Sequence, residues 1–120
     1  MAFLELLFTR GLEYRSLDVT TKRNYNAIMK LEWDPKKAVI NLREHRVSFE
    51  DAELVFYDVG RIEVYDGRDD YGEDRWATIG FAYSVVLYVV YTVRNEETIR
   101  LISVRKANDN ERNQYRKANH

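Results

Sequence analysis

The sequence predicts an α+β domain in which a mostly antiparallel sheet packs with two N-terminal helices and a C-terminal helix. Two helical segments with capping signals come first, at residues 35–45 and 48–58. Segments with the two-residue period of β-strands follow, and their connections are short enough for antiparallel neighbours. A capped, strongly polar helical segment begins after Asn108. This order of helices, strands and a last helix is typical of a sheet with helices packed on it.

Length and composition favour one globular domain. The chain has 120 residues, which suffice for one hydrophobic core, and its 45% hydrophobic and 32% charged residues exclude a disordered chain and a membrane protein. It has no cysteine and two histidines, which excludes disulfides, thiolate metal sites and histidine-rich metal sites. The start of the sequence is a poor signal peptide and no apolar run is long enough to span a membrane, so we expect a cytoplasmic protein.

Residues 1–28 differ in character from the rest of the chain. A short apolar opening precedes a polar stretch in which helical periodicity is weak. We expect a flexible N-terminal extension, and we hypothesise that Met29 is an alternative or true start of translation. The other interpretation is a helix that covers an edge of the sheet. Residues 29–120 then form the folded domain.

The first helix has the clearest signals in the chain. Residues 30–33 alternate as a short strand, after which Asp34 is a good N-cap and Pro35 suits the first helical position. The apolar stripe expected to face the core consists of Ala38, Val39 and Leu42.

The second helix is expected to begin at Ser48 and to end near Asp58, where Gly60 can serve as a C-cap. The residues along its apolar face are Phe49, Ala52, Val55 and Phe56.

Four strands are expected after Gly60. Residues 61–65 and 75–83 flank a polar loop, and residues 98–105 follow a tight turn. Residues 85–92 are apolar on both faces, so this segment should be the central strand, covered on both sides. The short connections predict an antiparallel meander.

Charge is distributed unevenly although the net charge is −1. Residues 50–74 carry ten acidic side chains against Arg61 and Arg68, whereas residues 105–117 carry five cations against two acids. This asymmetry permits a basic patch, or a match between acidic and basic faces within the molecule. In the acidic loop at residues 66–74 the glycine spacing does not fit a calcium-binding loop, so no metal site is expected there.

Four residues are candidates for chemistry on an anionic substrate. Arg105 and Lys106 end a strand, where they either present charge to a ligand or merely solvate the strand end. His45 can transfer protons near neutral pH, or it closes the first helix. Arg75 either holds a phosphate or pairs with Glu73.

The remaining inventory suits phosphodiester cleavage without a metal ion or cofactor. The sequence contains no glycine-rich phosphate loop, nucleophile elbow or thiol. Cations can hold a phosphate and stabilise its growing charge, while RNA supplies the nucleophile through its 2′-hydroxyl. On the last helix, Arg112 and Arg116 lie one turn apart, where they face RNA, an acidic partner or water. Trp76, Tyr88 and Tyr91 either stack on bases or belong to the core.

A series of short motifs extends over residues 29–117. The pieces are LEWDPKK (31–37), NLREH (41–45), VSFEDA (47–52), residues 66–75, IG (79–80), VYT (90–92), RLISVRKA (100–107), ER (111–112) and Tyr115. In this order and spacing they resemble the BrnT-type toxins of bacterial type II toxin-antitoxin systems. Two positions depart from the family pattern, since Arg46 stands where a glycine commonly follows the histidine and Val104 replaces a usual alanine.

The resemblance implies a RelE-like fold and a metal-independent endoribonuclease that inhibits growth by cleaving RNA. It also implies a complex with a BrnA-type antitoxin, through which alone the protein would reach operator DNA. The implied active-site residues are Arg75, Arg105 and Lys106, with His45 as a further proton-transfer candidate. Additional substrate contacts are expected from Arg68, Arg112 and Arg116.

Two other functions stay open at this point. A catalytically degenerate family member would act only as the antitoxin's partner and co-repressor. A basic surface that binds RNA without cutting it would show affinity that falls steeply with salt.

Overall fold

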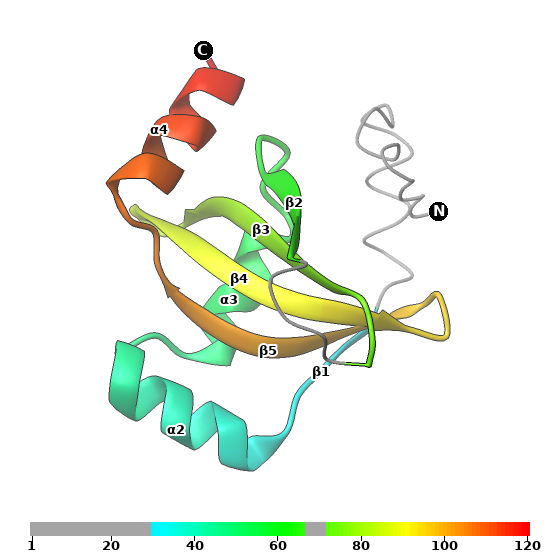
Figure 1. Cartoon of the computed structure of the whole chain (residues 1–120). Helices are drawn as coiled ribbons and strands as arrows, with labels where there is room; N and C mark the ends of the chain where they lie inside the picture. The colour runs from blue at the N-terminus through cyan, green and yellow to red at the C-terminus, as the bar shows by residue number, and fades with distance from the viewer. Residues whose placement is uncertain (1–29, 67–71) are drawn as a thin grey trace.

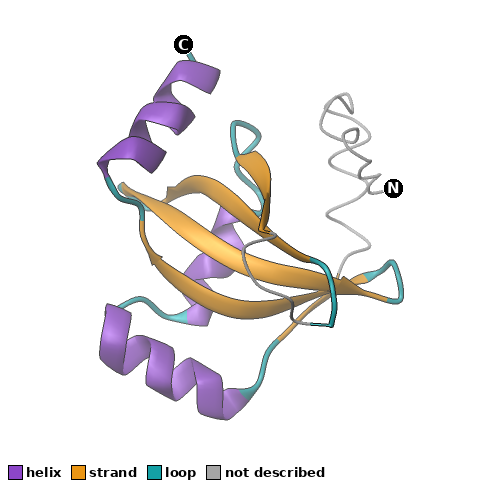
Figure 2. Cartoon of the chain, in the orientation of Figure 1, coloured by secondary structure: helices purple, strands orange, loops and turns teal. Residues whose placement is uncertain are grey.

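The computed structural model describes residues 30–66 and 72–120. In these residues a five-stranded sheet packs with three helices, which confirms the predicted α+β class (Figure 1, Figure 2). The expected N-terminal extension, the hypothesis about Met29 and the predicted contact from Arg68 lie outside the described residues. The elements in chain order are β1 (Lys30–Glu32), α2 (Pro35–His45), α3 (Phe49–Val55), β2 (Ile62–Asp66), β3 (Arg75–Ala82), β4 (Val85–Arg94), β5 (Thr98–Lys106) and α4 (Asp109–Ala118).

The sheet has the strand order β1-β5-β4-β3-β2. Strands β2 to β5 form the predicted antiparallel meander, with β4 in the centre. Strand β1 instead pairs in parallel with β5, and Lys30 lies opposite Thr98. Because β1 is only three residues long, it covers just the first part of β5. No helix among the described residues is long and apolar enough to cross a membrane.

Helix α2 begins and ends as its capping residues dictate. The side chain of Asp34 accepts a hydrogen bond from the Lys36 N–H at 2.9 Å, and Pro35 occupies the first turn. At the other end Arg46 adopts the left-handed conformation, with φ 61°, and its N–H donates to the Leu42 carbonyl. A glycine at this position would adopt the same conformation without strain.

Helix α3 is shorter than predicted. It begins at Phe49 after the N-cap Ser48, as expected, but it ends at Val55 instead of near Asp58. The N–H groups of the following three residues bond to carbonyls three residues back, so the chain tightens into turns before Gly60.

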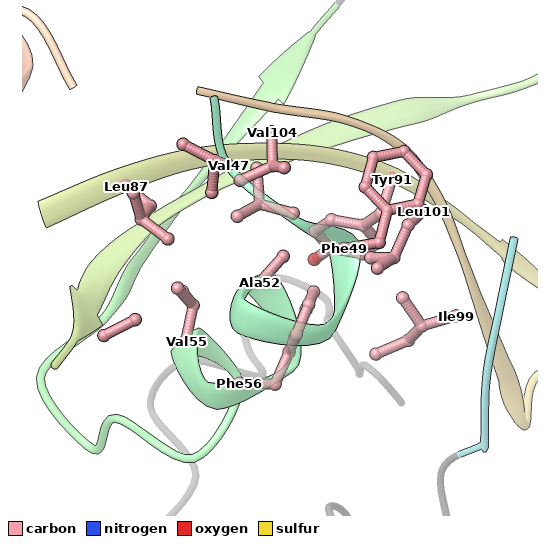
Figure 3. Close-up of a cluster of buried hydrophobic side chains, with 12 residues drawn as sticks. Val47, Phe49, Ala52, Val55, Phe56, Leu87, Tyr91, Ile99, Leu101 and Val104 are labelled. Atoms are coloured by element: carbon pink, nitrogen blue, oxygen red, sulfur yellow. The ribbon is translucent and has the colours of Figure 1, made fainter. Parts of the chain in front are cut away.

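The hydrophobic core lies between α3 and the sheet (Figure 3). The predicted apolar face of α3 is confirmed, and each of its four residues is at most 3% exposed. The ring of Phe49 packs edge-on against Trp33, and Phe56 packs edge-on against Tyr91. The sheet contributes Leu87, Val89, Tyr91, Ile99, Leu101 and Val104 to the same cluster.

The expected apolar stripe of α2 is wrong. Val39 and Leu42 are 58% and 50% exposed, only Ala38 packs against the core, and the buried residue is Asn41. Helix α2 lies beside β5, where β1 no longer supplies hydrogen-bonding partners. The backbone there needs a polar partner, so an amide faces inward where periodicity alone placed aliphatic side chains.

Strand β5 contains a β-bulge. The pairing with β4 shifts between Val90 and Tyr91, so that Ile102 has no partner residue on β4. A bulge reverses the alternation of side chains along its strand. Leu101 and Val104 can therefore both face the core although they are three residues apart.

The bulge also turns Arg105 to the face of the sheet opposite α3, which we call the outer face. This face also carries Arg75, Ile79, Tyr88 and Val90, as the cross-strand pairs show. Strand β4 is buried on both sides as predicted, since Val89 faces the core and Val90 on the outer face is 7% exposed.

Candidate functional site

Arg105 is held rigidly at the end of β5. Its guanidinium group lies over the ring of Tyr88, with Cζ 4.2 Å from the ring centroid. Two of its nitrogens donate to the two carboxylate oxygens of Glu111, each at 2.9 Å. A third bond runs from Nη1 to the Lys106 carbonyl at 3.1 Å. Such bidentate and stacked contacts fix the orientation of a guanidinium group as well as its position.

Glu111 connects this arginine to helix α4. The predicted capping box is present, because Glu111 accepts from the Asn108 N–H at 2.9 Å and the Asn108 side chain accepts from the Glu111 N–H at 2.8 Å. The same carboxylate that caps α4 therefore also binds Arg105. Sequence reasoning found the cap and missed the ion pair, because only the turn between β5 and α4 brings the two side chains together.

Helix α4 is fastened at its other end by polar contacts as well. The Tyr115 hydroxyl donates to Asp58 Oδ2 at 2.7 Å, and the Asn119 amide donates to the Gly60 carbonyl at 2.8 Å. Partial burial of the phenol, together with the hydrogen bond to Asp58, raises the pKa of Tyr115 to about 12. Helix α4 has no buried residue, so ion pairs and hydrogen bonds hold it against the sheet.

Lys106 and Arg105 point to opposite faces of the sheet, because side chains alternate along a strand. Lys106 lies opposite Leu87 and is exposed, and among the described residues no ion pair involves its side chain. The structure therefore does not bring these two neighbouring cations together on one face.

His45 is exposed at the C-terminal end of α2. Helix α2 runs alongside β5 in the same direction (Figure 1). The side chain of Asn41 in α2 is hydrogen-bonded to the backbone of Val104 in β5. His45 lies one helical turn beyond Asn41, about 6 Å further along the axis. It therefore lies toward the same end of the sheet as Arg105.

Arg75 begins β3 on the outer face, among acidic neighbours. It lies opposite Asp66, which is 5% exposed, and its Nε is 3.8 Å from Glu73 Oε2. Glu73 also binds Arg94 at 3.2 Å. The sequence left open whether Arg75 pairs with Glu73 or holds a phosphate, and the structure shows the contact with Glu73.

Arg75 and Arg105 share the outer face but lie far apart on it. Arg105 is opposite Tyr88 of β4, whereas the register places Arg75 level with Thr92. These rows are about 13 Å apart along the strands, and β3 and β5 are about 10 Å apart across the sheet. Their backbone positions therefore do not form the two halves of a single phosphate site.

The two arginines of α4 make local contacts. Arg112 donates to the Ala107 carbonyl at 2.5 Å and pairs with Asp109, and Arg116 donates to Asn113. Both belong to a helix with no buried residue, so their charge is accessible from solvent.

The three aromatic candidates have different environments. Tyr91 belongs to the core, where its hydroxyl donates to Glu63, the carboxylate that pairs with buried Arg61. Trp76 packs edge-on against Tyr65 with a centroid distance of 5.1 Å. Tyr88 is the one of the three that supports a candidate cation. The part of the chain that the structure describes contains no group of three potential metal ligands.

Comparison with known proteins places the chain in a family. Residues 33–111, about two thirds of the chain, match the family described as the ribonuclease toxin BrnT of type II toxin-antitoxin systems. The crystal structure of the Brucella abortus ribonuclease toxin BrnT has a similar fold, with a TM-score of 0.56 and 23% identity over 68% of this chain and 99% of that one. A search of curated protein sequences finds no match. The protein therefore belongs to the BrnT family of ribonuclease toxins of type II toxin-antitoxin systems.

Proposed function

We propose that this protein is an endoribonuclease toxin that cuts RNA without a metal ion and is neutralised by a BrnA-type antitoxin. Cleavage of RNA by the free toxin would then arrest growth. The observation that carries the proposal is the rigidly oriented Arg105 at the sheet end, within the residues that match the family. An oriented guanidinium group is well suited to bind a phosphate and to stabilise charge that develops on it.

The proposed reaction needs no nucleophile from the protein. The ribose 2′-oxygen attacks the adjacent phosphorus, the bond to the 5′-oxygen breaks, and a cyclic 2′,3′-phosphate and a 5′-hydroxyl result. Arg105 holds the reacting phosphate and stabilises its additional negative charge, while Lys106, on the opposite face of the strand end, adds positive charge nearby. His45 lies toward the same end of the sheet and moves the proton from the 2′-hydroxyl or to the leaving oxygen.

Arg75 takes a different role in this proposal. Arg75 lies too far from Arg105 along the strands to contact the same phosphate. In this proposal Arg75 therefore binds a different phosphate of the same RNA chain. Arg112 and Arg116 on α4 provide further contacts to the RNA backbone, and a contact from Arg68 remains a prediction from the sequence. Binding through several phosphates should weaken with added salt.

A second candidate function rests on the same ion pair. Glu111 already neutralises the charge of Arg105. Under this second hypothesis the arginine only fastens α4 to the sheet and binds no phosphate. The protein would then be a catalytically inactive family member that acts as the antitoxin's partner and co-repressor.

One experiment separates these functions. Purified protein free of antitoxin is incubated with RNA in EDTA, beside Arg105→Ala and the control Arg94→Ala, which also removes an ion-paired arginine from the sheet. We expect wild type and Arg94→Ala to yield cyclic phosphate ends, and Arg105→Ala to yield none while it still binds the antitoxin. Intact RNA with the wild-type protein would reject the ribonuclease proposal and support the co-repressor.

A further inference from the structure

We propose that Glu111 is a positioning residue of the ribonuclease site, which sets the orientation in which Arg105 meets the RNA phosphate. This inference rests on the proposed function. Two groups hold the guanidinium group of Arg105. The ring of Tyr88 packs against its flat face, and the carboxylate of Glu111 accepts hydrogen bonds from two of its nitrogens. A planar group held on a face and along an edge has little freedom to rotate.

Glu111 is itself fixed by backbone contacts, so it can act as a rigid support. The Ala107 N–H donates to the Val86 carbonyl at 3.0 Å, which ties the link between β5 and α4 to the neighbouring strand. The capping box then fixes Glu111 relative to Asn108. The Glu111 side chain is 12% exposed, compared with 34% for Arg105, so the support is better shielded from solvent than the arginine that it holds.

The contacts require a carboxylate with the length of glutamate. One oxygen accepts from both Asn108 and Arg105, and the other accepts from the second terminal nitrogen of Arg105. In Glu111→Gln one of these acceptors becomes an NH₂ donor that cannot bind the guanidinium group. The amide can still cap α4 through its oxygen, so the substitution acts mainly on the orientation and charge balance of Arg105.

The alternative is that the pair only fastens α4. A matched control is available at the far end of the helix, where Tyr115→Phe removes the hydrogen bond to Asp58 without touching Arg105. The exchange Arg105→Glu with Glu111→Arg is a second control, because it restores an ion pair between α4 and the sheet while moving the cation onto α4.

The test measures kcat and KM for cleavage of an RNA oligonucleotide, together with the melting temperature of each variant. We expect Glu111→Gln to lower kcat on the order of tenfold or more, as a slightly misplaced group does. We expect Tyr115→Phe to retain wild-type kcat, and the charge exchange to regain thermal stability without regaining cleavage. Tyr88→Leu removes the other support without altering α4 and should also lower kcat, which keeps the test informative if Glu111→Gln folds poorly.

Three results would overturn the inference. These are unchanged kcat in Glu111→Gln, an equal loss in Tyr115→Phe, and recovery of cleavage in the charge exchange. If wild type cleaves RNA and Arg105→Ala does not, the proposed function stands even when Glu111→Gln proves neutral. If wild-type protein leaves RNA intact, the proposed function fails and the positioning role fails with it.

Discussion

The side-chain amide of Asn41 pairs with both backbone groups of Val104, as a residue of a neighbouring strand would. Its Nδ2 donates to the Val104 carbonyl at 2.9 Å, and its Oδ1 accepts from the Val104 N–H at 3.1 Å. The same Nδ2 donates to the Val47 carbonyl at 3.1 Å. Asn41 is 5% exposed, so these backbone groups have little access to water. One amide thus replaces the edge pairing that β1 is too short to provide.

Replacing Asn41 with leucine should destabilise the fold severely. The substitution keeps a side chain of similar size but leaves three backbone groups unpaired, and we expect a loss of about 3 kcal/mol in the free energy of unfolding. Urea unfolding followed by circular dichroism measures it. Asn110→Leu, at an exposed position on α4, is the control and should stay within about 0.5 kcal/mol of wild type. Equal stability of the two variants would contradict this assignment.

Replacing Arg46 with glycine should stabilise the protein. Arg46 has φ 61° and ψ 27°, a conformation that strains every residue with a Cβ atom. Its side chain is exposed, so we expect Arg46→Gly to gain about 0.5 kcal/mol in the free energy of unfolding. Arg46→Ala removes the same side chain but retains the Cβ atom, and it should show no gain. A gain of equal size in both variants would point to the arginine charge instead of the backbone.

Adding a methyl group should be costly at Gly80 and mild at Gly60. A Cβ atom at Gly80 would lie 2.7 Å from Val55 Cγ1 and 3.0 Å from Arg61 Cβ, and both neighbours are buried. We expect Gly80→Ala to lose about 2 kcal/mol of stability through overpacking. At Gly60 the new atom would meet the exposed amide of Asn119, which can move aside, so Gly60→Ala should lose less than about 1 kcal/mol. The comparison uses chemical unfolding, and the reverse ranking would refute it.

Tyr115 should make the stability of the protein sensitive to alkaline pH. Burial and the hydrogen bond to Asp58 raise its pKa to about 12 in the folded state, compared with 10.0 for an ordinary tyrosine. Between these values the unfolded chain releases the proton and the folded chain retains it, so rising pH favours unfolding. We expect the stability advantage of wild type over Tyr115→Phe to be constant below pH 10 and to decline above it.

The hydrogen bond to Asp74 also raises the pKa of Tyr65. Tyr65→Phe should therefore reduce the same alkaline loss independently, and the double variant separates the two contributions. Urea titrations at a series of pH values provide the measurement. A difference between wild type and Tyr115→Phe that stays flat up to pH 12 would show that Asp58 does not stabilise the neutral phenol.

Local signals predicted the elements well and the contacts between them poorly. The caps at Asp34, Ser48 and Asn108 identified all three described helices, because a cap depends on neighbours two or three residues away. The parallel pairing of β1 with β5 was not predicted, since it joins residues such as Lys30 and Thr98 that are far apart in sequence. The apolar stripe of α2 failed for the same reason, because the partner of Asn41 is Val104.

The candidate site shows the same limit. Charge and position identified Arg105 as a candidate, but the bulge at Ile102 determines which face of the sheet Arg105 occupies. No sequence pattern in this strand predicts the bulge. The pair with Glu111 and the stacking on Tyr88 depend on how β4, β5 and α4 meet. The separation of Arg75 from Arg105 likewise follows from strand register, which periodicity alone does not determine.

The place of β5 in the sheet constrains the order of folding during synthesis. β5 is the last strand to be made, yet it lies between β1 and β4. Until residues 98–106 have left the ribosome, β1 has no strand to pair with, and Asn41 lacks its partner at Val104. The nascent chain can form the hairpins of β2 to β4, but the five-stranded sheet is complete only when β5 pairs with both β4 and β1. Arg105, near the end of β5, therefore reaches its position on the sheet in one of the last steps of folding.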